Sequence, residues 1–141
     1  MKLQLITLQG VAYDEDAYSV SLPTMEGEIT VLGHHEPLLS ALKPGVISIR
    51  RNRNDIEAKM EQFATYGGVA EIADDTVRVL VDEADYGDEI NAQEATAARE
   101  EAERLKAGAS SQQELAQAQS LIDRHAVRIR VAEIRRRHRR N

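Results

Sequence analysis

The residues best suited to metal chemistry are the adjacent His34 and His35, followed by Glu36. The string from His35 begins like the helical zinc-protease signature, but that signature needs a second histidine one turn later, where Leu39 stands. Pro37 disfavours a helix here, and adjacent histidines on an extended backbone point to opposite faces. We therefore expect no metal, and interpret the segment as a polar loop or a contact surface at the edge of a β domain.

An acidic stretch at residues 82–89 and the glycine pair Gly67-Gly68 are the other candidate sites. The acidic residues lack the alternation and glycine placement of a calcium loop, so a solvated linker is the better interpretation. The glycine pair lacks the lysine and further glycines of a phosphate loop, which indicates a tight turn or a bulge between strands. The chain has no cysteine, and its serines have no nucleophile-elbow setting. We expect no catalytic residue, and hence a protein that holds protein partners.

The charge of the chain is unevenly distributed around a formal net charge of −6. Acidic residues outnumber basic ones by sixteen to seven in residues 1–88, whereas residues 124–141 contain eight arginines and a single acidic residue, Glu133. The basic run at 135–140 is open to three interpretations: a solvated helix end, a nucleic-acid arm, or a docking surface for an acidic protein segment. The acidic remainder would repel phosphates, and no aromatic residue stands among the arginines to stack on bases, so we do not expect nucleic acid as a partner.

The start of the chain, Met1 to Leu5, alternates like a strand and does not form the apolar block of a signal peptide. No apolar run approaches the roughly 18 residues that a membrane helix needs. We expect a soluble, unprocessed chain.

Alternation with period two continues to about Asp82 and is typical of half-buried strands. Val77, Val79 and Val81 mark one strand, and the alternation over residues 56–61 predicts another. Turns are indicated by Pro44-Gly45, by residues 52–55 and by Asp74-Asp75. Strands this frequent, without a helix between them, predict an antiparallel β sandwich of about ten strands over residues 1–86.

Residues 87–141 are predicted to form a two-helix antiparallel hairpin, which makes the fold class α+β. Asn91, with Glu94 three residues later, predicts an N-cap, and the helical period then runs to about Ala107. A break at residues 108–110 precedes a second, longer helix.

The facing stripes of the two helices are mostly alanine, so they bury little area and contribute only a few kcal/mol, at about 0.8 kcal/mol per buried methylene. Opened out, some fifty helical residues at ~1.5 Å each would reach roughly 75 Å. A thin seam and a long reach together suggest a detachable switch.

Several motifs in linked order resemble the central signature of the ATP synthase epsilon subunit. That family has a Gly-Glu strand, an Asn-His-x-Pro-Leu loop, a Leu-Lys-Pro-Gly turn and a Gly-Gly strand followed by a hairpin. The corresponding segments here are residues 24–32, 34–39, 41–45, 67–72 and 77–82.

The resemblance implies a non-catalytic rotor subunit of a proton-translocating ATP synthase. Its sandwich would bind the gamma subunit and rest on the c-ring, at the cytoplasmic side of the inner (plasma) membrane if the source is bacterial. In bacterial members the hairpin leaves the sandwich, extends along gamma into the catalytic head and opposes ATP hydrolysis.

The resemblance also implies two groups of contact residues. The c-ring and gamma interface would include Gly27, Glu28, His35, Pro37 and Leu38. An acidic segment of the beta subunit, beside alpha, would meet Arg130, Arg135, Arg136 and Arg137. Exposed ion pairs contribute roughly 0 to 1 kcal/mol each, so this contact is comparable in strength to the alanine seam that it would replace.

The chain departs from the family at the motif through which some relatives bind ATP. That motif reads Ile/Leu-Asp-x-x-Arg-Ala, and here Asn91 replaces the aspartate and Glu94 the arginine. A carboxylate where a triphosphate needs a cation predicts no useful ATP affinity and no cofactor. The alternative to a rotor subunit is a β-sandwich adaptor with an arginine-rich nucleic-acid-binding tail.

Overall fold

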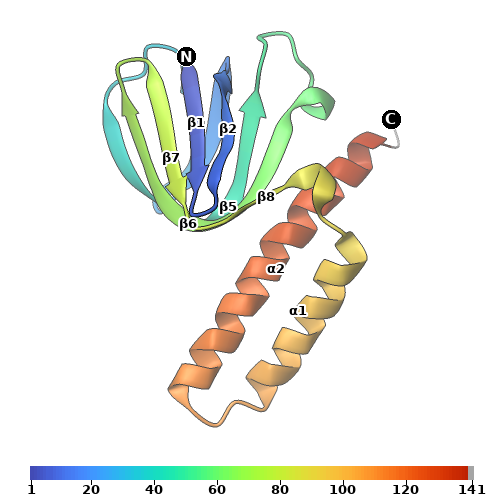
Figure 1. Ribbon diagram of the computed structural model, residues 1–141. Helices are drawn as coiled ribbons and strands as arrows, with labels where there is room; N and C mark the ends of the chain where they lie inside the picture. The colour runs from blue at the N-terminus through green and yellow to red at the C-terminus, as the bar shows by residue number, and fades with distance from the viewer. Residues whose placement is uncertain (140–141) are drawn as a thin grey trace.

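The computed structural model describes residues 1–139, so Arg140 and Asn141, the end of the predicted basic tail, lie outside the described part of the chain. Figure 1 shows a β sandwich from one end of which two long helices project side by side. The predicted fold class, a sandwich followed by a helical hairpin, is confirmed.

Within residues 1–139, eight strands build the sandwich, in the spatial order β2-β1-β7-β6-β5-β3-β4, with β8 beside β6. Every pair of neighbours is antiparallel except β1 and β7, which are parallel. The bounds are β1 (Lys2–Thr7), β2 (Gly10–Asp16), β3 (Ser19–Thr24), β4 (Gly27–Leu32), β5 (Leu38–Arg50), β6 (Glu61–Ala73), β7 (Thr76–Val81) and β8 (Ala84–Tyr86).

Strands β5 and β6 are 13 residues each and take part in both layers of the sandwich. The turn predicted at Pro44-Gly45 is wrong, because the pairing of β5 with β6 continues on both sides of it. A Cβ added at Gly45 would lie 2.6 Å from Cβ of Pro23, so the glycine lets β3 approach closely. Gly67 and Gly68 likewise lie inside β6 and not between two strands, with φ of +111° and +155°.

The strand predicted over residues 56–61 is also wrong. A 3₁₀ turn at Glu57–Lys59 occupies this segment, and the side chain of Ile56 is 64% exposed. These corrections leave eight strands instead of about ten. The turn predicted at residues 52–55 is confirmed by a hydrogen bond from the Asp55 amide to the Asn52 carbonyl, and the hairpin at Asp74-Asp75 by left-handed backbone angles at both residues.

The core between the two layers comes from the inward-facing side of nearly every strand. The alternation of Val77, Val79 and Val81 is confirmed, since all three are buried, as are Leu3 and Leu5 on β1. Removal of these side chains from water is the main favourable term for the sandwich.

The hairpin comprises α1 (Ala92–Ala107) and α2 (Gln112–Arg139). The predicted N-cap is confirmed, because the Glu94 amide donates to Oδ1 of Asn91 at 3.0 Å. The seam is as thin as predicted, with Ala95, Ala102 and Ala118 buried in it. Within residues 1–139, no helix is both long and apolar enough to cross a bilayer.

Gly68 provides a test of the bent-strand architecture. A Cβ at this position would lie 2.2 Å from the Leu80 carbonyl oxygen, and the φ of +155° is unfavourable for any other residue. We expect Gly68→Ala to lower the free energy of unfolding by about 2–4 kcal/mol in urea denaturation followed by circular dichroism. The control is Gly33→Ala, where the nearest atom, Oδ1 of Asp75, is 3.7 Å away and the loss should be small. Equal effects of the two substitutions would contradict the architecture.

Candidate functional site

The C-terminal half of α2 lies against the sandwich, and arginines make most of the polar contacts there. Arg124, Arg128 and Arg135 are four and seven residues apart, so at 3.6 residues per turn they share one face of the helix. Their partners follow one another along the segment that leads into α1. The guanidinium groups pair with Glu83 at 2.6 Å, Asp85 at 2.5 Å and Asp88 at 2.8 Å, respectively.

Tyr66 of β6 connects the first two of these ion pairs. Its hydroxyl donates to Oδ2 of Asp85, the same oxygen that Arg128 contacts, while the Arg124 guanidinium lies 4.3 Å from the centre of its ring. Burial, followed by the hydrogen bond to Asp85, raises the pKa of Tyr66 well above its usual value, so the phenol stays protonated. The hydrogen bond from Arg124 lowers the pKa of Glu83.

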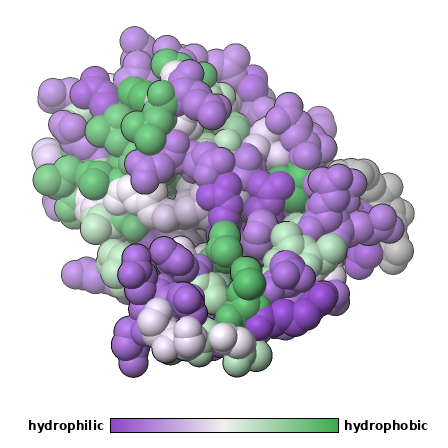
Figure 2. Space-filling model, turned by 60° about the horizontal axis from the view of Figure 1, so that its bottom comes forward, coloured by the Kyte–Doolittle hydropathy of each residue, from purple (hydrophilic) through white to green (hydrophobic). Residues whose placement is uncertain are grey.

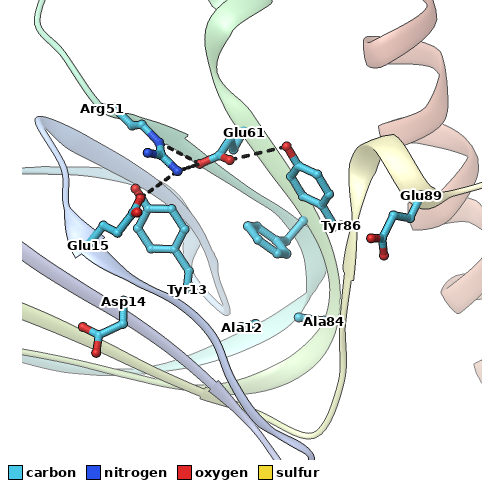
Figure 3. Close-up of a pocket in the computed structure, with 10 residues that line it drawn as sticks. Ala12, Tyr13, Asp14, Glu15, Arg51, Glu61, Ala84, Tyr86 and Glu89 are labelled. Carbon is cyan, nitrogen blue, oxygen red and sulfur yellow. Dashed lines mark hydrogen bonds and ion pairs between the residues drawn. The ribbon is translucent and has the colours of Figure 1, made fainter.

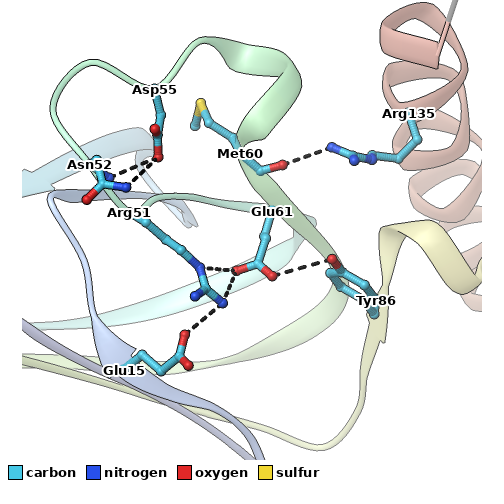
Figure 4. Close-up of polar contacts among 8 residues, drawn as sticks. All are labelled: Glu15, Arg51, Asn52, Asp55, Met60, Glu61, Tyr86 and Arg135. Atoms are coloured by element: carbon cyan, nitrogen blue, oxygen red, sulfur yellow. Dashed lines mark hydrogen bonds and ion pairs between the residues drawn. The ribbon is translucent and has the colours of Figure 1, made fainter.

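Arg135 makes the most extensive contact. Its Nη1 donates to the Met60 carbonyl at 2.8 Å (Figure 4). The same nitrogen donates to Oε1 of Gln62 at 2.9 Å, while Nε donates to Oδ1 of Asp88. The side chain is only 17% exposed, and Gln62 is buried. Removal of Arg135 from this position would leave a buried amide oxygen and a backbone carbonyl without their donor.

A small apolar cluster lies beside these arginines. Val131 and Ala132 of α2 pack on Val46, Ala64 and Ile90, and Val131 is completely buried. The helix can approach this closely because the 3₁₀ turn at Gly87–Glu89 begins with glycine. A Cβ on Gly87 would lie 2.8 Å from Cγ1 of Val131 and 3.0 Å from the Gln62 carbonyl oxygen.

The interpretation of residues 82–89 as a solvated linker is wrong, because three of its carboxylates pair with α2. The sequence contained a signal for this: acidic residues at 83, 85 and 88 complement arginines that share one helical face. Of the four arginines expected to meet the beta subunit, Arg135 is engaged within this chain. Arg130, Arg136 and Arg137 are exposed.

The residues expected at the c-ring and gamma interface are spread along the sheet edge formed by β4. Gly27 and Glu28 begin this strand, whereas His35 and Pro37 lie in the exposed loop beyond its other end, and Leu38 begins β5. At ~3.3 Å per residue the strand separates the two groups by roughly 16 Å. Within residues 1–139 no cluster of metal-binding side chains is found, at His34 and His35 or elsewhere.

A second surface, which sequence reasoning missed, crosses the outer face of the layer that contains β1, β2 and β7. The strand registers place five apolar residues in one row. Val69 is 40% exposed and Leu80 45% exposed at its centre. Figure 2 shows apolar surface, in green, gathered on the sandwich among hydrophilic residues. This apolar row consists of Ala41, Val69, Leu80, Ile6 and Val11.

Comparison with known proteins identifies the family of the chain. A family model described as the ATP synthase delta/epsilon chain β-sandwich domain matches residues 1–87. The chain is 34% identical over 136 residues to the ATP synthase epsilon chain of Herpetosiphon aurantiacus, covering 96% of each. It is 37% identical over 133 residues to that of Syntrophobacter fumaroxidans, covering 94% of this chain and 96% of the relative.

Solved structures give the same result. A chain of the Euglena gracilis mitochondrial ATP synthase, in a structure of OSCP, F1 and the c-ring, superposes with a TM-score of 0.79 at 25% identity, covering 93% of this chain and 79% of that one. A chain from the central stalk and c-ring of the Tetrahymena thermophila mitochondrial enzyme shares the fold, with a TM-score of 0.63 at 18% identity and coverage of 94% and 96%. The protein therefore belongs to the family of ATP synthase epsilon chains.

Proposed function

We propose that this chain is a non-catalytic subunit of the central stalk of a proton-translocating ATP synthase, and that its hairpin restrains ATP hydrolysis. Family membership and the assemblies in which its relatives occur support the first part. The observation that carries the second part is the interface between α2 and the sandwich, which holds the hairpin through exchangeable arginine–carboxylate pairs. In a bacterium the subunit would lie at the cytoplasmic side of the plasma membrane, peripheral to it. No observation favours the adaptor with a nucleic-acid-binding tail.

The sandwich offers two surfaces for the rest of the rotor. The apolar row is the surface that we assign to gamma, because contiguous exposed apolar side chains on a sheet face are typical of protein interfaces. The β4 edge, from Gly27 and Glu28 to His35, Pro37 and Leu38, is assigned to the c-ring side. A sandwich bound to gamma through the apolar row and to the c-ring through the β4 edge would rotate with the stalk, while the hairpin remained free to move.

The hairpin is held weakly enough to be released. The three ion pairs are partly exposed to solvent, so each contributes about 0–1 kcal/mol. The small apolar cluster and the hydrogen bonds of Arg135 to Met60 and Gln62 each add about a few kcal/mol. Arg130, Arg136 and Arg137 are exposed and could meet an acidic segment of beta while the hairpin is still docked. Arg135 would exchange Asp88 for a partner carboxylate only when α2 leaves the sandwich.

We also propose that the isolated chain has no useful ATP affinity. Asn91 caps α1 with its side-chain oxygen, and Glu94 is exposed in the first turn of the helix. A hollow of about 400 Å³ between the start of α1 and α2 is lined by two carboxylates, of Asp88 and Glu133, and one guanidinium, of Arg136. A triphosphate would be repelled there more than attracted.

Leu80→Asp tests the assignment of gamma. A carboxylate at the centre of the apolar row would have to be desolvated at the interface, so co-purification with gamma should fall at least tenfold while the thermal unfolding temperature changes little. Ile56→Asp, in an exposed loop outside the row, is the matched control and should bind gamma normally. Unchanged binding of the Leu80 variant would refute the assignment.

Deletion of Ala109 to Asn141 tests the inhibitory role. Without α2 the subunit keeps the apolar row and the β4 edge, so assembly with gamma should be preserved. ATP hydrolysis by the complex should rise several-fold. Steady-state ATPase assays on purified complexes measure this. Unchanged hydrolysis by a fully assembled complex would remove the inhibitory claim.

Gly87→Ala tests whether docking opposes inhibition. The added Cβ would clash with Val131, which should weaken docking by about 1–3 kcal/mol and shift the hairpin toward its released, inhibitory state. We expect lower ATPase activity, and faster amide hydrogen exchange in the C-terminal half of α2 in the isolated chain.

The control for this test is Gly108→Ala, where the nearest atom, the Arg104 carbonyl oxygen, is 3.7 Å from the added Cβ. Val131→Ala combined with Gly87→Ala should partly restore docking, because it removes the clashing methyl group. Equal ATPase activity in the Gly87 and Gly108 variants would show that docking and inhibition do not compete.

A further inference from the structure

A cleft of about 560 Å³ opens on the side of the sandwich where β2 and β8 leave the two layers unjoined. It is separate from the α2 interface, the apolar row and the β4 edge. Tyr13 and Tyr86 line it from two sides (Figure 3), and Phe63 is the third aromatic residue of its lining. Its charged lining consists of Asp14, Glu15, Glu61, Glu89 and Arg51.

The cleft carries an excess of negative charge. Among the described residues that line it, Arg51 alone is cationic, and it is shared between Glu15 at 2.7 Å and Glu61 at 3.1 Å. The four carboxylates are spread around the opening, and within residues 1–139 no group of them converges as metal ligands do. An elongated organic cation, whose charges can reach separate carboxylates, fits this distribution better than a metal ion.

Tyr13 supplies a second, independent observation that points to a ligand. The residue is 6% exposed, yet its buried hydroxyl has no hydrogen-bond partner among residues 1–139. Figure 3 shows the ring rising toward Arg51 and Glu15 in the cleft. Buried hydroxyl groups are almost always paired, because an unpaired one loses its hydrogen bonds to water without replacement.

The chemistry around Tyr13 suits a cation. The Arg51 guanidinium lies 5.4 Å from the centre of the ring, so one cation is already accommodated beside it by cation–π contact. Burial raises the pKa of Tyr13, so the hydroxyl keeps its proton and can accept a hydrogen bond from an N–H donor. Tyr86 donates to Glu61 on the other side of the opening and thereby orients that carboxylate.

We propose that this cleft binds an ammonium or guanidinium group carried on an alkyl chain, with the Tyr13 hydroxyl and the carboxylates of Glu15 and Glu61 as its acceptors. Two sources share this chemistry: a free di- or polyamine, and a lysine or arginine side chain of a protein. The inference concerns the sandwich alone and does not depend on the role of the hairpin.

The test is a titration of the ¹⁵N-labelled full-length chain, followed by NMR, with two probes. Agmatine carries a guanidinium and an ammonium group on one alkyl chain, and N-acetyl-arginine amide presents an arginine side chain without a further charge. Saturable shifts at the amides of Tyr13, Arg51 and Tyr86 are expected. Binding of agmatine alone indicates a free amine, and binding of the capped arginine indicates a protein side chain. Unsaturated shifts with both probes would overturn the proposal.

Variants separate specific binding from charge screening. Tyr13→Phe removes only the unpaired hydroxyl, so it should weaken binding about fivefold without lowering the thermal unfolding temperature. Glu15→Gln should weaken binding by a similar factor or more. Glu26→Gln, an exposed carboxylate in the turn between β3 and β4, is the matched control and should bind normally. Equal affinity in all three variants would also overturn the proposal.

Discussion

The arrangement of the whole chain depends on how closely α2 approaches the sandwich at Gly87. A side chain at that position would collide with Val131 and with the Gln62 carbonyl, and the helix would then stand too far away for Arg135 to reach Met60 and Gln62. One missing Cβ thus permits both the burial of Val131 and the arginine contacts beside it. The α1 helix packs along α2, so the position of the entire hairpin follows from this contact.

The bends of β5 and β6 prepare the surface on which α2 lies. Because both strands continue past their glycines into the second layer, Val46 and Ala64 lie paired on the outside of the sandwich, where Val131 and Ala132 cover them. β8 pairs with β6 on the edge opposite β5 and brings Asp85 beside Tyr66. The docking of the hairpin therefore depends on the curvature of the sheet.

The sequence predicted what depends on local pattern. The inward alternation of Val77, Val79 and Val81 and the cap at Asn91 follow from rules that act over a few residues. It failed where the outcome depends on distant partners. Pro44-Gly45 has the composition of a turn, but β6 and Pro23 hold it in a strand. The alternation over residues 56–61 had no neighbouring strand to pair with, so a 3₁₀ turn formed instead. The candidate site was half predicted: Arg135 was singled out, yet its partner Asp88 was assigned to a solvated linker. The matching charges are present in the sequence, but 47 residues separate the two, and only the docked helix shows that they pair.

The chemistry of the docked state limits what can drive the proposed release. In both states arginines of α2 would face carboxylates, within this chain when docked and on beta when extended. Ionic strength would screen the two sets of pairs to a similar degree, so the Coulombic terms largely cancel in the difference between the states. The remaining difference lies in what release uncovers. It exposes Val131, Ala132 and the alanine seam unless new partners cover them, and it removes the donor of the Gln62 amide oxygen. Whether such cover is available would depend on the position of gamma relative to the catalytic head, so this position would control the release of the hairpin. The arginines would determine where the released helix binds.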